Sequence, residues 1–141
     1  MKTYIENVIT TEEANSIKNL SGTALSDHPV VSKIKGIIEQ EVGEELDWTK
    51  PSYLSIERNG NHDWHVDTGG AYNNPEPHMK WCDYGCSILL QDHEDPGFLA
   101  YRDGTKIKNY LGLAIHSSDI EHKITSYSGE RLTFLAFVKK A

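Results

Sequence analysis

The sequence predicts an α+β domain in which two helices precede a larger part built from seven or eight short strands. Two observations support this prediction. Apolar residues recur at helical spacing up to residue 48, whereas from residue 49 onward they form short alternating runs separated by turn residues. We therefore expect one domain over residues 1–141, with a helical support region at 1–48 and a β-barrel or β-sandwich core at 49–141.

The composition is that of a globular protein and argues against nucleic acid and membranes as partners. Hydrophobic residues make up 38% of the chain and charged residues 25%, as in globular proteins. The formal net charge of −7 argues against nucleic acid as the main partner, because affinity for phosphate backbones rests largely on Lys and Arg. The longest apolar run, at 134–138, is far shorter than the roughly 20 residues that cross a bilayer, and no signal peptide is visible. We expect a cytoplasmic protein that binds no membrane.

Both predicted helices have recognisable start signals. Thr10 and Glu13 match a capping box, so the first helix should begin after Thr10, and Ser21-Gly22 should end it. Pro29 suits the first turn of the second helix. An apolar stripe at helical spacing follows, formed by Val30, Ile34, Ile37, Ile38 and Val42. We expect both N-terminal helices to support a sheet.

The predicted strands follow in short segments bounded by turns. We expect them at 53–58, 63–67, 81–91, 98–102, 110–116, 122–126 and 131–139. The long polar segment at 68–78 directly follows His65 and Asp67, and a long loop in such a position commonly serves as a lid. Cys82 and Cys86 have no second cysteine pair to complete a zinc site, so we interpret them as reduced packing residues.

The segment at 64–70 carries the residues with the clearest chemical meaning. His65 and Asp67 are two residues apart, so in a strand their side chains point to the same face. One imidazole nitrogen and one carboxylate oxygen are two of the three ligands of a 2-His-1-carboxylate site for non-haem Fe(II). His116 and His122, each at one end of a predicted strand, are the candidates for the third ligand.

The order of the motifs resembles that of a known family. His65-x-Asp67 is followed 57 residues later by His122, and Gly129-x-Arg131 comes after it. With the apolar strand at 87–90, this set resembles the Fe(II)- and 2-oxoglutarate-dependent oxygenases, and within them the prolyl 4-hydroxylase-like group. The resemblance covers most of residues 53–138. It implies a double-stranded β-helix, the jelly-roll barrel also found in cupins, and it favours His122 over His116 as the third ligand.

The resemblance also implies an activity and its co-substrates. The family uses Fe(II), 2-oxoglutarate and O2, with ascorbate as an accessory reductant, to hydroxylate a C–H bond while 2-oxoglutarate becomes succinate and CO2. His65, Asp67 and His122 would bind the metal. The guanidinium of Arg131 would bind the far carboxylate of 2-oxoglutarate in a bidentate manner, and Thr133, on the same strand face, would add a hydrogen bond.

The chain departs from the family at one position. A tyrosine that helps to hold 2-oxoglutarate usually precedes the first histidine by nine or ten residues, where this chain has Ser55 and Ile56. Tyr53 is the nearest tyrosine and is our candidate for that role. Position alone suggests four substrate contacts, namely Trp64, Tyr72, Tyr101 and Arg102.

Three functions are compatible with these motifs. The subfamily resemblance suggests a hydroxylase of prolyl residues in a peptide or protein. The same machinery could instead hydroxylate a free amino acid or another small molecule. The third alternative is a non-catalytic, cupin-like metal-binding module. Arg131 argues against this third alternative, because a plain metal-binding barrel does not need a cation placed to bind a dicarboxylate.

Overall fold

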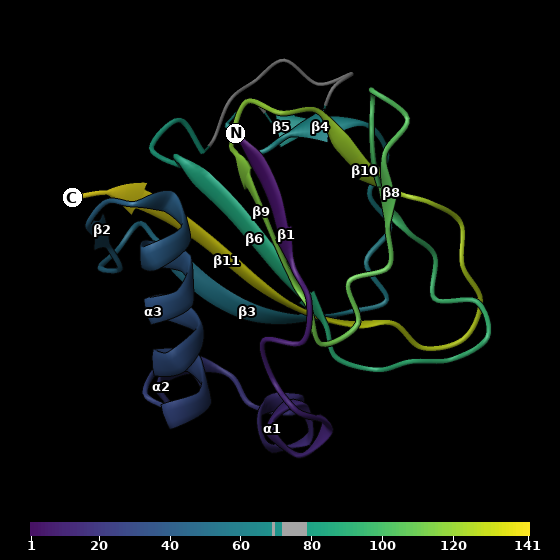
Figure 1. Cartoon of the computed structure of the whole chain (residues 1–141), viewed down its shortest axis with the longest axis horizontal. Helices are drawn as coiled ribbons and strands as arrows, with labels where there is room; N and C mark the ends of the chain where they lie inside the picture. The colour runs from purple at the N-terminus through teal and green to yellow at the C-terminus, as the bar shows by residue number, and fades with distance from the viewer. Residues whose placement is uncertain (69, 72–78) are drawn as a thin grey trace.

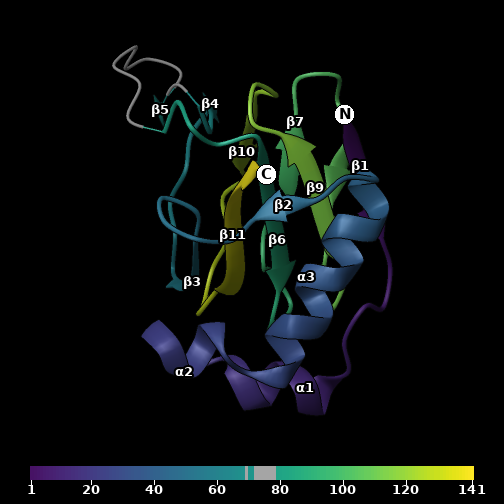
Figure 2. The same ribbon diagram turned by 90° about the vertical axis from the view of Figure 1, so that its left-hand side faces the viewer.

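The computed structural model describes residues 1–68, 70–71 and 79–141. The chain forms two antiparallel sheets, and the helices lie against one face of the larger sheet (Figure 1). The view turned by 90° shows α3 (Pro29–Val42) running alongside the strands of this sheet (Figure 2). The expected α+β class, with the strands forming the larger part, is confirmed.

The helical region contains three helices, where the sequence suggested two. They are α1 (Thr11–Ile17), α2 (Gly22–Ser26) and α3 (Pro29–Val42). Gly22, which we expected to end the first helix, is the first residue of α2 and has a φ of +56°. Glycine adopts this left-handed conformation at little cost, so the stop signal in the sequence is also the start of another short helix.

The predicted starts of α1 and α3 are confirmed. The Thr10 side chain accepts a hydrogen bond from the Glu13 backbone N–H, and the Glu13 side chain accepts one from the Thr10 backbone N–H. Pro29 lies in the first turn of α3, where its missing N–H costs nothing. His28 caps the same helix, because its Nδ1 accepts a hydrogen bond from the Val30 backbone N–H at 3.1 Å.

The larger sheet has the strand order β1-β9-β6-β11-β2, and β3 also pairs with β11. Two short strands, β1 (Lys2–Ile5) and β2 (Leu46–Asp47), come from the region that we expected to be helical. The sheet is completed by β3 (Tyr53–Arg58), β6 (Tyr84–Leu89), β9 (Leu113–Ser117) and β11 (Leu132–Lys140).

The smaller sheet has the strand order β5-β4-β10-β7-β8. Its strands are β4 (His65–Val66), β5 (Gly70–Ala71), β7 (Leu99–Tyr101), β8 (Lys106–Ile107) and β10 (His122–Ile124). β4, β7 and β10 are shorter than the segments predicted from the sequence, and β5 and β8 lie outside every predicted strand. Two candidate metal ligands, His65 and His122, are direct partners across β4 and β10.

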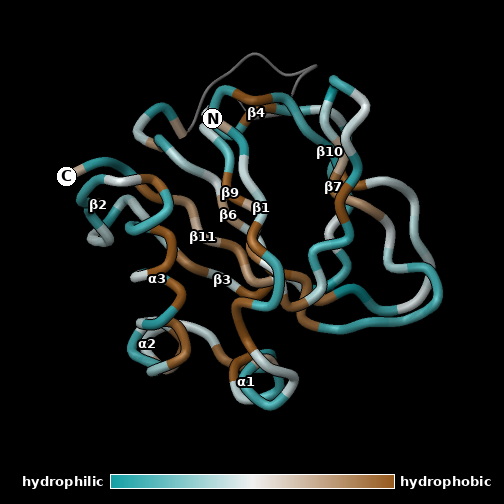
Figure 3. Tube along the Cα trace, viewed as in Figure 1, coloured by the Kyte–Doolittle hydropathy of each residue, from teal (hydrophilic) through white to brown (hydrophobic). Residues whose placement is uncertain are grey.

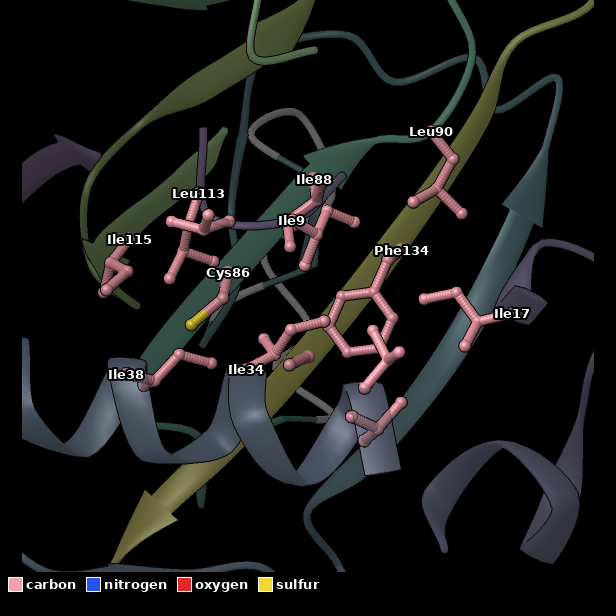
Figure 4. Packing of buried hydrophobic residues seen from close by; sticks show 14 of the residues in the cluster. Ile9, Ile17, Ile34, Ile38, Cys86, Ile88, Leu90, Leu113, Ile115 and Phe134 are labelled. Atoms are coloured by element: carbon pink, nitrogen blue, oxygen red, sulfur yellow. The ribbon is translucent and has the colours of Figure 1, made fainter. Parts of the chain in front are cut away.

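The hydrophobic core lies between the larger sheet and the helices. Along β11, Leu132, Phe134 and Val138 are buried in this core, together with Ile34 and Ile38 of α3 (Figure 4). The hydropathy colouring shows the same apolar layer along α3 and the neighbouring strands (Figure 3). Because side chains alternate along a strand, the residues between these core positions point to the opposite face, toward the smaller sheet.

The structure bears on the expected state of the two cysteines and on membrane-spanning helices. Cys82 and Cys86 are both buried and unpaired, as expected for packing residues, and burial raises the pKa of the Cys82 thiol to about 12. Among the described residues, none of the helices has the length and apolar character needed to span a bilayer.

Candidate active site

Three side chains converge at one point between the two sheets. His65 lies on β4, Asp67 follows that strand, and His122 lies on the neighbouring strand β10. The Nε2 atoms of His65 and His122 are 3.6 and 3.4 Å from the same carboxylate oxygen, Oδ1 of Asp67. One donor atom from each residue lies within 4.8 Å of the other two, as a shared metal ion requires. The structure therefore brings together the three ligands proposed from the sequence.

Backbone carbonyl groups fix the orientation of both imidazoles. The Nδ1 atom of His65 is 2.7 Å from the carbonyl oxygen of Asp63, and Nδ1 of His122 is 2.8 Å from that of Ile120. A carbonyl oxygen can only accept a hydrogen bond, so Nδ1 carries the proton in each ring. The lone pairs on both Nε2 atoms are then free to bind a metal, which is the arrangement typical of metal-ligating histidines.

The protonation states also suit metal binding. Asp67 is only 5% exposed. Burial tends to raise the pKa of Asp67, but the hydrogen bond from His116 and the nearby His122 ring outweigh it and hold that pKa well below its usual range. Burial, together with the nearby His122, lowers the pKa of His65. An anionic carboxylate and a neutral imidazole are the forms that ligate metals, and the donor set fits Fe(II).

His116, the competing candidate for the third ligand, lies behind Asp67. Its Nε2 atom is 2.8 Å from Oδ2 of Asp67. His65 and His122 contact the other carboxylate oxygen, Oδ1. Its Nδ1 atom is 3.2 Å from the hydroxyl of Tyr101. His116 is thus a hydrogen-bonding partner of a proposed ligand. The sequence alternation along β9 could have indicated that His116 faces the smaller sheet, because Leu113 and Ile115 face the core and neighbouring side chains point to opposite faces.

A cavity of about 420 Å³ extends from this cluster along the inner face of the larger sheet. Side chains from β3, β6 and β11 form its floor, and the candidate metal ligands form part of its wall. Residues from β3 at alternate positions face it, namely Tyr53, Ser55 and Glu57. The cavity is also lined by Arg131, which directly precedes β11, and by three residues of β11, namely Thr133, Leu135 and Phe137.

Arg131 places a buried positive charge in the wall of this cavity. It is 3% exposed, its Nε donates to the carbonyl oxygen of Pro96 at 2.8 Å, and its Nη1 donates to Oγ1 of Thr133 at 2.8 Å. Burial lowers the pKa of Arg131, but a guanidinium stays charged in proteins. Within the described part of the chain, no carboxylate forms an ion pair with it. A buried charge without a counterion is costly unless a ligand supplies one.

Tyr53 lies at the edge of the cavity. It is 43% exposed, its ring contacts that of Phe137 at a centroid distance of 5.2 Å, and its hydroxyl is 3.9 Å from Sδ of Met79. Tyr53 therefore shares the cavity with Arg131, and its role in holding 2-oxoglutarate stays a prediction.

Sequence reasoning missed an ionic pair in the same cavity. Nε2 of His62 is 2.7 Å from Oε2 of Glu57, and this hydrogen bond raises the pKa of His62. His62 lines the cavity. No local pattern identifies its partner, because Glu57 lies on β3, across the turn at Asn59-Gly60.

None of the described residues that we proposed as substrate contacts, Trp64, Tyr101 and Arg102, lines the cavity. Tyr101 is 3% exposed and packs beneath His116 and His122, so it supports the site and is not accessible to a substrate. Trp64 and Arg102 lie outside the cavity lining and stack on each other, with the guanidinium carbon 3.9 Å from the ring centroid. Arg102 also forms an ion pair with Glu121. Tyr72 lies outside the described residues.

Gly85 on β6 is required by the packing around Asp67. A Cβ atom at this position would lie 2.1 Å from Oδ2 of Asp67 and 2.7 Å from Nε2 of His116. We therefore expect Gly85→Ala to displace the carboxylate and to lower metal affinity by about 10- to 100-fold, the range seen when the support of metal ligands is disturbed. Calorimetric titration with Mn(II) measures this loss.

Gly36→Ala is the matched control for Gly85→Ala. It lies in α3, and a Cβ atom there meets nothing within 4 Å. Alanine is favoured over glycine inside a helix, so this variant should unfold at a slightly higher temperature and bind Mn(II) normally. Equal Mn(II) affinity for Gly85→Ala and the wild type would contradict the role given to Gly85.

No protein-family model and no curated protein sequence matches the chain. Its fold, however, matches solved structures along nearly its whole length. A Pseudomonas putida prolyl-4-hydroxylase matches with a TM-score of 0.66 and 11% identity, over 99% of this chain and 84% of the other. A viral collagen prolyl hydroxylase from Paramecium bursaria Chlorella virus-1, solved as a complex with 2-oxoglutarate, gives 0.68 and 12%, over 99% and 96%.

A third match is an oxidoreductase of the 2-oxoglutarate-Fe(II) oxygenase family from Burkholderia pseudomallei. It has a TM-score of 0.58 and 13% identity, over 84% of this chain and 57% of the other. At these identities the matches establish the fold. The resemblance inferred from the motifs is thereby confirmed at the level of the fold, and the two facing sheets are consistent with the jelly-roll of these proteins.

Proposed function

We propose that this protein is an Fe(II)- and 2-oxoglutarate-dependent dioxygenase that hydroxylates a C–H bond. The observation that carries the proposal is that one cavity holds both a 2-His-1-carboxylate cluster and a buried arginine that forms no ion pair with any carboxylate of the described residues. A metal site alone would fit many cupin-like proteins. The added buried cation fits a site for an anionic co-substrate, and the neighbours in the fold include a 2-oxoglutarate complex.

His65, Asp67 and His122 would hold the metal. Bound Fe(II) would supply the oxidative chemistry, coupled to the conversion of 2-oxoglutarate to succinate and CO2. The protein's contribution is to keep both Nε2 atoms unprotonated and to keep the Asp67 carboxylate charged. Because all three residues line the cavity, they would hold the metal at its wall, where further ligands could reach it.

Arg131 would bind the far carboxylate of 2-oxoglutarate. Its Nε and Nη1 are held by Pro96 and Thr133, so the guanidinium is fixed before the ligand arrives. Such preorganisation lowers the entropic cost of binding. The Thr133 hydroxyl accepts from Arg131 and can donate its own proton to the same carboxylate. Tyr53 at the cavity edge is our candidate for a further contact with the co-substrate.

A prolyl residue of a peptide or protein is the substrate we propose. The support is that several structures with this fold are prolyl hydroxylases. A free amino acid or other small molecule remains the alternative on the same site. The non-catalytic binding module is disfavoured by Arg131, since binding a metal alone does not require a buried cation that is not ion-paired within the described residues.

Turnover of 2-oxoglutarate tests the proposal directly. The purified protein is incubated with Fe(II), ascorbate and 2-oxoglutarate in air, with and without a proline-rich peptide, and succinate is measured. We expect slow succinate formation without peptide, stimulation by the peptide, and a hydroxyl group on proline by mass spectrometry. Turnover that no peptide stimulates would favour a small-molecule substrate. Absence of both turnover and 2-oxoglutarate binding would favour the binding module.

A further inference from the structure

We propose that His116 is a positioning residue that keeps the Asp67 carboxylate monodentate, so that the coordination positions needed by the co-substrate stay open. The inference rests on the proposed function, because it concerns how the cluster shares its positions between protein and 2-oxoglutarate. It assigns to His116 a role different from that of a ligand.

The two oxygens of Asp67 have different environments. Oδ1 is the oxygen that both proposed histidine ligands approach, at 3.6 and 3.4 Å. Oδ2 is 2.8 Å from Nε2 of His116, a normal hydrogen-bond distance. The carboxylate thus presents one oxygen to the metal position and has the other occupied by the protein.

The direction of this hydrogen bond follows from the partners. An ionised carboxylate only accepts, so Nε2 of His116 donates to Oδ2 of Asp67. The neutral ring then has an unprotonated Nδ1, which can accept a hydrogen bond from the hydroxyl of Tyr101, 3.2 Å away. His116 and Tyr101 are 4% and 3% exposed, so water does not compete for these contacts. The chain from Tyr101 through His116 to Asp67 therefore has one consistent arrangement of protons.

The backbone of β6 lies directly against the hydrogen bond between His116 and Asp67. Gly85 pairs directly with His116 across β6 and β9. The position of an added Cβ at Gly85 falls 2.1 Å from Oδ2 of Asp67 and 2.7 Å from Nε2 of His116. The carboxylate oxygen and the imidazole nitrogen therefore lie against the strand at a point where only a glycine leaves enough space.

The number of open coordination positions on the metal depends on whether Asp67 binds through one oxygen or two. Two histidines and a monodentate carboxylate leave three of six octahedral positions open, whereas a bidentate carboxylate leaves two. Chelation of 2-oxoglutarate would take both of those two and leave none for O2. If Oδ2 were released from His116, it could turn toward the metal and compete with the co-substrate. Loss of His116 should thus weaken 2-oxoglutarate binding more than metal binding.

A pair of variants of similar size tests this proposal. His116→Gln keeps an N–H donor that can reach Oδ2, whereas His116→Met has a similar shape and no donor. Titration calorimetry measures Mn(II) affinity on the metal-free protein and then 2-oxoglutarate affinity on the Mn(II)-loaded protein. We expect His116→Met to weaken 2-oxoglutarate binding to the Mn(II)-loaded protein at least about tenfold more than it weakens Mn(II) binding. His116→Gln should recover most of the 2-oxoglutarate affinity.

Two further variants keep the test decisive. Ile115→Val is the control, because it lies on the same strand and faces the helices, and it should change neither affinity. Tyr101→Phe removes one hydroxyl and should weaken 2-oxoglutarate binding two- to fivefold, which provides a test even if His116→Met does not fold. Equal losses of Mn(II) and 2-oxoglutarate affinity in His116→Met, or no rescue by His116→Gln, would overturn the proposal. A wild-type protein that binds neither ligand would instead overturn the proposed function on which it rests.

Discussion

Asp67→Ala is expected to abolish Fe(II) binding while the fold survives. The carboxylate is the only anionic member of the cluster, and its Oδ1 lies within 3.6 Å of both imidazole nitrogens. Disturbing the support of a ligand already costs about 10- to 100-fold in metal affinity, so removal of the ligand itself should cost at least about 100-fold. His65→Ala should give a similar loss. Anaerobic titration with Fe(II), or titration with Mn(II) in air, measures the affinity.

The stability of Asp67→Ala should change only moderately. The substitution leaves Nε2 of His116 without its acceptor, which costs about 1–3 kcal/mol of unfolding free energy. It also removes a buried charge, which offsets part of this cost. Thermal unfolding followed by circular dichroism should therefore still show a cooperative transition. Asp119→Ala, an exposed carboxylate outside the cavity, is the control and should bind metal normally. Unchanged metal affinity in Asp67→Ala would refute the assignment of the cluster.

Arg131→Ala should remove 2-oxoglutarate binding without removing the metal. Truncating one partner of a buried charge pair typically costs 2–5 kcal/mol, and the middle of this range corresponds to about 100-fold or more in affinity. Arg131→Lys should recover only part of it, because an ammonium group cannot form the bidentate contact of a guanidinium. The measurement is the concentration of 2-oxoglutarate needed for half-maximal succinate formation, together with Mn(II) affinity.

Arg58→Ala is the matched control for Arg131→Ala. Arg58 is an exposed cation on β3 whose side chain pairs with Glu130. Its removal should leave the 2-oxoglutarate requirement unchanged, because surface ion pairs contribute little and Arg58 does not line the cavity. A parallel loss of 2-oxoglutarate affinity in both arginine variants would indicate long-range charge effects and would contradict a specific site at Arg131.

The sequence predicted those features that depend on local spacing. The two-residue interval between His65 and Asp67 and the alternation along 131–139 both follow from strand geometry. The alternation predicted that Arg131 and Thr133 share a face, and the structure joins them by a hydrogen bond of 2.8 Å. The capping box likewise depends only on residues that are three apart in the chain.

Features that depend on tertiary contacts were not predictable from one sequence. β1 and β2 are too short to leave a periodic pattern, and they form because β9 and β11 offer them unpaired backbone groups. The hydrogen bond between His116 and Asp67 joins residues 49 positions apart. Its existence depends on how β9 packs behind the loop after β4, which no local signal encodes. The pair of Glu57 and His62 spans only five positions, and it forms because the chain turns back between them at Asn59-Gly60.

A crystal structure of the protein with Mn(II) and 2-oxoglutarate would show whether the metal and the co-substrate bind as proposed. We expect one metal ion bound by Nε2 of His65, Oδ1 of Asp67 and Nε2 of His122, with the 2-oxoglutarate chelating it and its far carboxylate on the Arg131 guanidinium. A metal ion bound elsewhere, or a 2-oxoglutarate whose far carboxylate avoids Arg131, would contradict this expectation.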